Sequence, residues 1–388
     1  MDQNILPNPT SIVLNPAQTK NGPDFNYYEE YIFDKPYIRG LFIFLYTVVF
    51  CLCFFGNLLV ILAVTLSRRL RRTTTNFFLA NLAVADISVA VFCVYQNFFI
   101  YIIESWMLGE FLCKMYIFIQ SLSNSASIVI LVVISSERYF AIMYPMRCKQ
   151  ILTTIRLRII IATVWIGCVF YSAPKFYFSN TVTVNTGDTN ETVCVLNREK
   201  FDSKLFDMIH FVLLYLIPLA VISILYTKIA IRLWKSSNQL QHDLDASCNH
   251  TLSYDNSFRI ENTKNHRHLI PNTQNGKLEN LLVRSPTQAS ISHNMLKARK
   301  GVIKMLIIVV CAFALFNLPY HARKMWQYWS PNYKGHTNFS ALFTPLTFLS
   351  AYFNSGINPL LYALLSKNFR GGMRELLFWC TKPRYNHR

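Results

Sequence analysis

Long uncharged, apolar runs alternate along this chain with short polar segments. A helix of about 20 apolar residues crosses the roughly 30 Å hydrocarbon layer of a membrane. Lipid offers the backbone no hydrogen-bond partners, so helices are the expected form of such segments. The pattern therefore predicts an all-α membrane protein, a bundle of seven transmembrane helices. The runs without Asp, Glu, Lys or Arg are Leu41–Ser67, Ile87–Ile103, Met115–Ser136, Ile159–Pro174, Met208–Thr227, Met305–Ala322 and Gly335–Ser366.

Two other architectures fit this pattern poorly. Outer-membrane barrels need strands of alternating apolar and polar residues, and the sequence contains no such series. Core helices of a large soluble protein rarely stay uncharged over 22 residues, the length of Met115–Ser136. The composition agrees with a membrane protein, because 52% of the residues are hydrophobic and only 15% are charged.

Basic residues gather in alternate connecting segments and after the last run. Short cytoplasmic loops are enriched in Lys and Arg, so we expect a multi-pass plasma-membrane protein whose amino terminus is extracellular. The formal charge of +18 then reflects topology and contact with anionic lipid, and it implies no nucleic-acid partner. The residues concerned are Arg68, Arg69, Arg71, Arg72, Arg147, Lys149, Arg156, Arg158, Lys228, Arg232, Lys235, Lys297, Arg299, Lys300, Lys304, Arg370, Arg374, Lys382, Arg384 and Arg388.

The runs divide the chain into five parts. Residues 1–37 form an extracellular tail without the apolar core of a cleavable signal peptide. Residues 38–235 hold the first five spans, and residues 297–366 hold the last two. Residues 236–296, rich in Asn, Ser, Thr, His and Gln, form a third cytoplasmic loop that we expect to be disordered. Residues 367–388 form a short amphipathic helix on the inner membrane surface and a short tail.

Two of the ten cysteines are placed to form a disulfide. Cys113 lies at the outer end of the third run, and Cys194 lies in the loop before the fifth, both on the oxidising side. Such a bridge would stabilise the fold by about 2–4 kcal/mol. The same side carries candidate glycosylation sites at Asn190 and Asn338, and Cys380 after the amphipathic helix is a candidate palmitoylation site.

Polar motifs stand inside or at the edges of the apolar runs. An ionisable residue at bilayer depth costs roughly 2.5–3.5 kcal/mol or more, so Asp86 needs a function or a partner. Glu137-Arg138-Tyr139 closes the third run, and Asn358-Pro359-Leu360-Leu361-Tyr362 lies near the end of the seventh. With further single residues in the expected order, this constellation resembles the peptide-receptor branch of the rhodopsin-like (class A) G-protein-coupled receptors. The further residues are Gly56, Asn57, Trp165, Pro218, Tyr226 and Pro319.

The resemblance implies an activation switch that couples to a heterotrimeric G protein. Glu137 would hold Arg138 in an inward-closed arrangement, and loss of that contact would free the guanidinium for Tyr226, Tyr362 or a partner helix. Helix kinks at prolines would let the sixth segment swing at its inner end. The switch residues are Glu137, Arg138, Tyr139, Tyr226, Phe313, Asn317, Pro319, Asn358, Pro359 and Tyr362.

The sequence departs from the family before Pro319. Relatives usually carry a Trp where this chain has Asn317, so a ring-flip trigger is in doubt. Phe313, which we expect near Ile128 and Pro218, is the better candidate for transmitting the signal.

Oxygen donors near mid-membrane are suited to a sodium ion, as the resemblance implies. A hydrogen-bonded polar cluster without an ion is the alternative. No other cofactor is implied, and the family adds arrestin, a receptor kinase and membrane lipid as expected partners. The candidate sodium residues are Asp86, Ser127, Asn354, Ser355 and Asn358.

The residues expected at the extracellular mouth favour a peptide ligand. The seventh run has no Lys for the Schiff base of an opsin, and Gln120 stands where monoamine receptors need an Asp. Arg323 and Lys324 could meet acidic groups or the carboxy terminus of a peptide. The stretch from Asn317 to Trp329 resembles insect receptors for a small disulfide-bridged neuropeptide. The candidate pocket residues are Gln96, Trp106, Gln120, Tyr320, His321, Arg323 and Lys324.

Other functions remain open at this point. A receptor for another peptide or for a non-amine ligand fits the same residues. An ion-coupled transporter fits less well, because Asp86 is the one clear carboxylate at membrane depth. No enzyme is expected, since the sequence has neither metal-spaced His and Glu residues nor a serine elbow motif.

Overall fold

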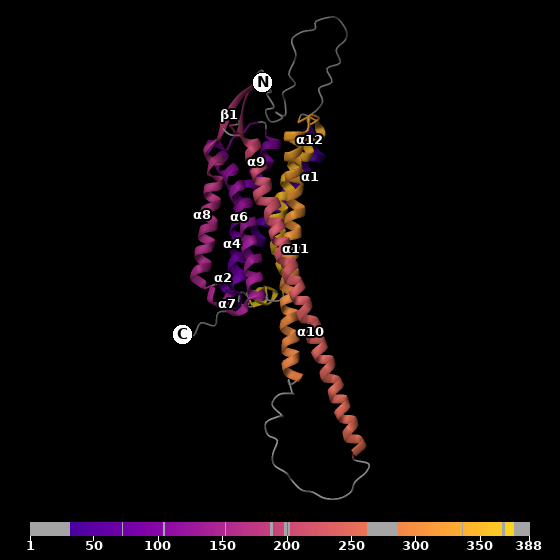
Figure 1. The fold of residues 1–388 in the computed structure, drawn as a ribbon. Coiled ribbons are helices and arrows are strands. Elements are labelled where there is room, and N and C mark those ends of the chain that lie inside the picture. Colours follow the sequence, from indigo (N-terminus) through magenta and orange to yellow (C-terminus); the bar gives the residue numbers. More distant parts are fainter. Residues whose placement is uncertain are drawn as a thin grey trace, which may run out of the picture.

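The computed structural model describes residues 32–71, 73–103, 105–151, 153–186, 189–197, 200, 202–261, 286–335, 337–366 and 369–375. Long helices lie side by side in one bundle, with a β-hairpin at one end (Figure 1). We name this the hairpin end. The opposite end carries α3 (Arg68–Arg71), α7 (Pro145–Ile151) and the helical residues 369–375, and we name it the basic end.

Seven continuous helical rods correspond to the seven uncharged runs. π-helical turns interrupt the first, second and fifth rods, and such turns occur often at functional sites. The turn η4 ends at Leu216, two residues before Pro218, whose ring cannot supply a backbone N–H. The rods are α1 (Pro36–Cys51) with η2 (Leu52–Gly56) and α2 (Asn57–Leu66); α4 (Thr74–Val89) with η3 (Ala90–Val94) and α5 (Tyr95–Ile102); α6 (Gly109–Met143); α8 (Thr154–Tyr177); α9 (Ser203–Phe211) with η4 (Val212–Leu216) and α10 (Ile217–Glu261); α11 (Pro286–Trp329); and α12 (Asn338–Leu365).

Six of these rods in the described part of the chain are long and apolar enough to cross a membrane. The seventh, α12, has 28 residues and no charged side chain, so its length also suffices. It is less apolar because Asn354, Ser355 and Asn358 interrupt it, and all three are buried inside the bundle. The predicted seven-helix membrane fold is therefore confirmed.

The bundle has an apolar core and an apolar outer surface. Toward the basic end the core includes Ile134, Tyr226 and Leu306, and toward the hairpin end it includes Tyr46 and Tyr352. Large apolar side chains such as Phe44, Phe170 and Leu315 instead face outward and are exposed. An exterior this apolar is suited to lipid.

Two rods approach closely where glycine replaces a side chain. A Cβ at Gly356 of α12 would lie 3.0 Å from Cβ of Leu52 and 3.2 Å from Sγ of Cys53. The close approach lets Asn57 Nδ2 donate a hydrogen bond to the backbone oxygen of Ser355 at 3.0 Å. The first and seventh rods are therefore held together by a polar bond as well as by packing.

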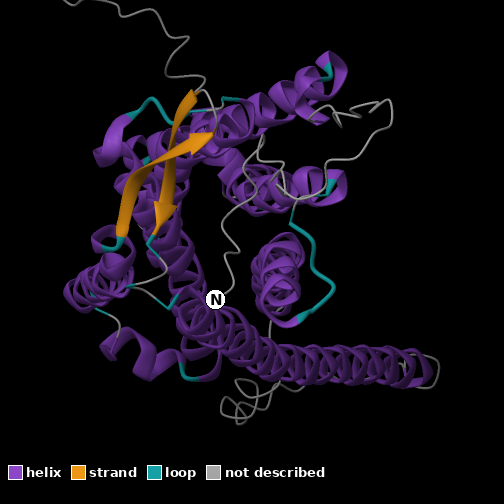
Figure 2. Ribbon diagram, turned by 90° about the horizontal axis from the view of Figure 1, so that it is seen from above, coloured by secondary structure: helices purple, strands orange, loops and turns teal. Residues whose placement is uncertain are grey.

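The hairpin is tied to the rest of the bundle. Strands β1 (Ser179–Thr186) and β2 (Thr189–Leu196) pair antiparallel and lie over one side of the bundle (Figure 2). The predicted disulfide is confirmed, since Cys113 of α6 is bonded to Cys194 of β2. The backbone N–H of Trp106 also donates to the backbone oxygen of Thr192 at 2.6 Å. The disulfide and hydrogen bonds such as this one attach the hairpin to the bundle.

The expected disorder of residues 236–296 is wrong at both ends of that segment. Helix α10 continues to Glu261, and helix α11 begins at Pro286. No Gly or Pro occurs in residues 219–261, so nothing in that stretch breaks the helical hydrogen bonding. Pro286 stands at the first helical position, where its missing N–H costs nothing. Residues 262–285 lie outside the described residues.

The predicted amphipathic helix is present as residues 369–375. Phe369 is buried against the ring of Tyr362, while Arg374 is exposed. Ser67 Oγ donates to Glu375 Oε2 at 2.7 Å, which joins this helix to the loop after the first rod. Cys380 lies outside the described residues.

We predict that Gly356→Val lowers stability, because the new side chain forces η2 and α12 apart. Overpacking of this kind costs about 1–3 kcal/mol. The measurement is the melting temperature of the purified protein in detergent. Gly167→Val on α8 is the matched control, since nothing lies within 4 Å of a Cβ at that position. Equal losses in the two variants would contradict the proposed close contact.

Candidate functional site

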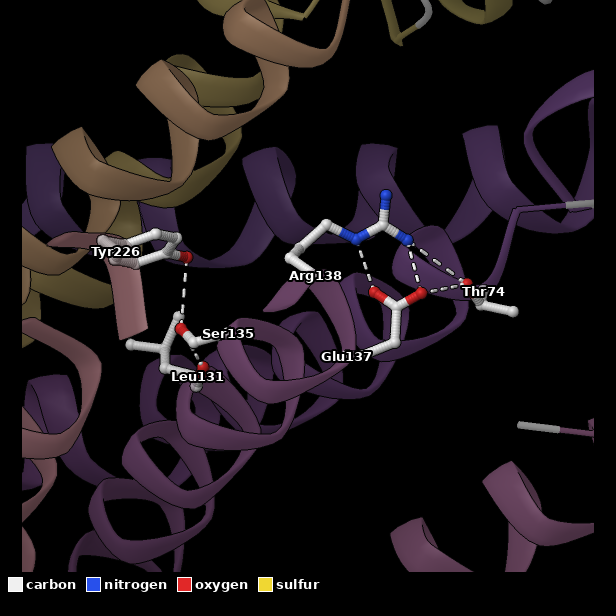
Figure 3. A network of polar contacts seen from close by, with 6 residues as sticks. All are labelled: Thr74, Leu131, Ser135, Glu137, Arg138 and Tyr226. Carbon is white, nitrogen blue, oxygen red and sulfur yellow. Dashed lines mark hydrogen bonds and ion pairs between the residues drawn. The ribbon is translucent and has the colours of Figure 1, made fainter. Parts of the chain in front are cut away.

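A buried ion pair stands near the basic end of α6. Both Arg138 Nε and Arg138 Nη2 donate to the carboxylate of Glu137, each at 2.5 Å (Figure 3). Thr74 of α4 supports the pair, because its hydroxyl donates to Glu137 Oε1 at 2.8 Å. Glu137 is only 6% exposed, so its charge depends on these contacts.

The guanidinium of Arg138 points toward Glu137 and Thr74 rather than toward the fifth rod. The hydroxyl of Tyr226 lies 3.1 Å from Ser135 Oγ, on the other side of Arg138 in Figure 3. Tyr362 is buried, and its hydroxyl has no hydrogen-bond partner among the described residues. The contact between Glu137 and Arg138 that the sequence led us to expect is therefore present.

The third motif residue has a peripheral place. The ring of Tyr139 packs against Phe140 at 5.7 Å and Tyr144 at 6.4 Å between centroids. Tyr139 therefore contributes to packing at the end of α6, and Glu137 and Arg138 form the ion pair.

A second polar site lies in the middle of the bundle around Asp86. The carboxylate is fully buried, and Asn358 Nδ2 donates to its Oδ2 at 2.9 Å. Its Oδ1 has no partner in the described part of the chain, and neither has Oδ1 of the buried Asn354. Ser127 and Ser355 are buried as well. The cluster has two oxygen acceptors whose bonding capacity is unused.

A cavity of ≈ 80 Å³ connects this cluster to the hairpin half of the bundle. That space holds several water-sized groups. Gln120 and Tyr320 line it, and so do Ser127, Asn354 and Ser355. The remaining lining residues are Val89, Ile117, Ser121, Ser123, Asn124, Lys175, His210, Asn317, Ala351 and Tyr352.

Asn317 occupies the wall of the cavity beside the Pro319 kink. Its Nδ2 donates to the backbone oxygen of Phe313 at 2.9 Å, one helical turn earlier. Phe313 is buried, and its ring lies 6.3 Å from that of Tyr215. The hydroxyl of Tyr215 donates to the backbone oxygen of Ala314 at 2.8 Å, which ties the fifth rod to α11 at the same level.

Several predicted pocket residues do not line the cavity. Gln96 donates to the backbone oxygen of Val91 at 3.0 Å, and Trp106 Nε1 donates to that of Gly109 at 2.8 Å. The ring of His321 packs at 4.7 Å from Tyr215. None of these three side chains lines the cavity.

The two predicted basic residues have different environments. Lys324 Nζ lies 3.2 Å from Asp207 Oδ2 and is therefore already neutralised. Arg323 is only 5% exposed; its Nε donates to Thr347 Oγ1 at 2.8 Å, and its ring neighbours are Tyr320 and Phe348. Its Nη2 has no hydrogen-bond partner among the described residues.

Four residues at the cavity were not predicted from the sequence: Lys175, His210, Asn124 and Asp207. Lys175 and His210 line it, and His210 Nε2 lies 2.9 Å from Asn124 Nδ2. Asp207 lies behind them and bridges to Lys324. Lys175 directly follows one uncharged run and Asp207 directly precedes the next, so in the sequence each marks only the boundary of a span. The signal in the sequence that could have identified them is a pair of opposite charges at the outer ends of neighbouring spans.

A buried polar network that joins four rods was not predicted either. The hydroxyl of Tyr46 donates to Asn97 Oδ1 at 2.8 Å, and Asn97 Nδ2 donates to the hydroxyl of Tyr116 at 2.9 Å. Gln120 Nε2 donates to the hydroxyl of Tyr352 at 3.2 Å, on the cavity wall. Buried networks of this kind fix one arrangement of the helices that they join.

Comparison with known proteins identifies the architecture. Residues 56–362 match the 7 transmembrane receptor (rhodopsin family) domain. The chain belongs to this family. The receptor is 46% identical to the Trissin receptor of Drosophila melanogaster, over 91% of its own length and 69% of that protein.

More distant relatives are also peptide receptors by name. The receptor is 28% identical to Galanin receptor 2b of Danio rerio, over 85% of its length and 73% of that protein. It is 26% identical to the Substance-P receptor of Canis lupus familiaris, over 86% of its length and 70% of that protein. The predicted membership in the rhodopsin-like receptors is confirmed.

We predict that Glu137→Gln raises signalling in the absence of ligand, because the neutral amide holds Arg138 less strongly. Couplings of this kind amount to about 1–3 kcal/mol, so we expect a rise of about 5-fold or more. The measurement is basal nucleotide exchange at matched surface expression. Glu110→Gln is the control, because Glu110 pairs with Lys114 at the opposite end of α6. Unchanged basal exchange in Glu137→Gln would contradict the role of the ion pair.

Proposed function

We propose that this receptor binds a trissin-like peptide outside the cell and activates a heterotrimeric G protein inside it. The identity of 46% with the Drosophila melanogaster Trissin receptor carries the proposal. The cavity toward the hairpin end supports it, because most of the described side chains that line it are polar and none of them is an Asp that could pair with an amine. The ligand is then the small disulfide-bridged neuropeptide that the sequence led us to expect.

The hairpin end is proposed to face outward and the basic end to face the cytoplasm of the plasma membrane. Described basic residues near α3, α7 and the inner ends of α10 and α11 support this orientation. The disulfide and the exposed Asn190 and Asn338 lie toward the other end, where oxidation and glycosylation occur. Residues 1–31, which lie outside the described residues, then begin outside the cell.

The signal is proposed to pass along α11. A ligand that contacts the cavity wall near Asn317 changes the packing of Phe313 against Tyr215. Because Pro319 removes a backbone hydrogen bond, the inner half of α11 can swing away from α6. The opening then gives Arg138 a new partner in the G protein.

A sodium ion is proposed to bind between the mid-bundle oxygen donors. Asp86 Oδ1 and Asn354 Oδ1, both buried and unpartnered in the described part of the chain, fit this role. Ser127, Ser355 and Asn358 would complete the donor set. A bound cation would neutralise Asp86 and favour the arrangement in which these rods stay together.

The remaining partners are proposed from the family. Arrestin and a receptor kinase would act at the basic end after activation. Anionic lipid would contact basic side chains such as Arg374, and Cys380 would carry a palmitoyl group.

We predict that trissin activates cells that express the receptor and that Arg138→Ala removes most of this response. The variant should bind the peptide with similar affinity, because Arg138 lies at the opposite end of the bundle from the hairpin. Peptide binding, calcium and cyclic AMP are measured at matched surface expression. Galanin and substance P serve as comparison ligands. Activation by one of these and not by trissin would contradict the ligand assignment, and full signalling by Arg138→Ala would contradict the switch.

We predict that Asp86→Asn removes the effect of sodium on agonist affinity. In the unchanged receptor, affinity should be about 5-fold or more lower in sodium chloride than in choline chloride at equal ionic strength. Ser121→Ala is the control, because Ser121 lines the same cavity but lies outside the proposed donor set. Equal affinities in the two salts for the unchanged receptor would refute sodium binding.

A further inference from the structure

The charges beside the cavity do not balance. Lys175 of α8 and Lys324 of α11 share a single carboxylate, that of Asp207 on α9. Two ammonium groups and one carboxylate leave a surplus of one positive charge. All three side chains are largely buried, with 14%, 18% and 12% of their surface exposed. A surplus charge in such a place favours the binding of an anion.

Asp207 is committed to Lys324 rather than to Lys175. Its Oδ2 lies 3.2 Å from Lys324 Nζ and accepts a hydrogen bond from the hydroxyl of Tyr328 at 2.7 Å. Lys175 Nζ is 4.0 Å from Oδ1, too far for a hydrogen bond. Its other close neighbour is the ring of Phe206, at 4.6 Å. Lys175 is therefore the ammonium whose charge is least satisfied.

Lys175 is also the lysine that reaches the cavity. Among the described residues that line it, Lys175 alone carries a fixed charge, and the others are neutral or titratable as histidine. The same wall offers His210, Asn124 and Gln120 as further polar groups. An ammonium beside such groups recognises a carboxylate and repels an amine.

We infer that Lys175 is the anchor for a carboxylate of the peptide ligand, either an acidic side chain or the carboxy terminus. Lys324, which the sequence predicts to bind an acidic group of the peptide, instead holds Asp207 in place. Lys324 thereby keeps Asp207 from neutralising Lys175. This inference rests on the proposed function, because it requires a peptide in the cavity. The inference specifies that the ligand group beside α8 is a carboxylate.

The test is a cycle between receptor variants and peptide variants. Trissin is compared with analogues in which each carboxyl group in turn, including the carboxy terminus, is converted to an amide. The receptors are the unchanged chain, Lys175→Gln, Lys175→Arg and the control Lys204→Gln. Lys204 lies on the same helix as Asp207 and is exposed, with its ammonium 4.0 Å from the ring centroid of Trp329.

One analogue should lose about 10-fold or more in potency on the unchanged receptor and on Lys204→Gln. Lys175→Gln should lose a similar factor for trissin and show no further loss for that analogue. Lys175→Arg should keep the preference for the acid. These results together support the anchor, since a purely structural role of Lys175 would weaken acid and amide alike.

Two outcomes overturn the inference. The first is equal potency of trissin and every amide analogue on the unchanged receptor, a result that needs no variant to fold. The second is an acid preference that persists in Lys175→Gln at the cell surface. Both leave the proposed function intact, because trissin still activates the unchanged receptor. Failure of trissin on the unchanged receptor would instead defeat the proposed function.

Discussion

The structure depends on the need to satisfy polar groups that lipid cannot solvate. Asp86 is fully buried, and its hydrogen bond to Asn358 joins the second rod to the seventh in the middle of the bundle. Asn57 makes the matching bond between the first rod and the seventh. Because each lost bond would leave a polar group stranded in a medium without water, these contacts fix which helices are neighbours. Apolar packing alone would specify that order far less strictly, since lipid is as apolar as the side chains that face it.

The same requirement bears on the two arrangements of the bundle that the proposed function needs. Among the described residues, some buried polar atoms lack hydrogen-bond partners, and Asp86 Oδ1 and Asn354 Oδ1 are two of them. The hydroxyl of Tyr362, nearer the basic end, also lacks a hydrogen-bond partner among the described residues. A fully satisfied interior would favour one state strongly, whereas unused bonding capacity lets an alternative set of contacts compete. The proposed sodium ion favours the closed arrangement, and the proposed G protein favours the open one.

The sequence predicted the architecture better than the site. Uncharged runs locate the rods because hydrocarbon imposes a length and a composition on each span. Cys113 and Cys194 were identifiable because few cysteines lie on the side predicted to be oxidising. Motifs also located Arg138 and its partner Glu137. The pairing of Lys324 with Asp207 could not be predicted, because it depends on how the fifth and sixth rods are rotated about their axes. Disorder at the inner ends of these rods was also mispredicted, since polar composition was weighed above the absence of helix-breaking residues.

The attachment of the hairpin has a consequence for the kinetics of recognition. A covalent bond to α6 and a backbone bond to Trp106 restrain the hairpin at the end where the proposed ligand would enter. A peptide that is itself cross-linked would also arrive with few conformations to lose. Association of two such preorganised surfaces forfeits little conformational entropy, and this gain commonly appears as slow dissociation. The attachment of the hairpin therefore favours slow dissociation of the ligand more than fast association.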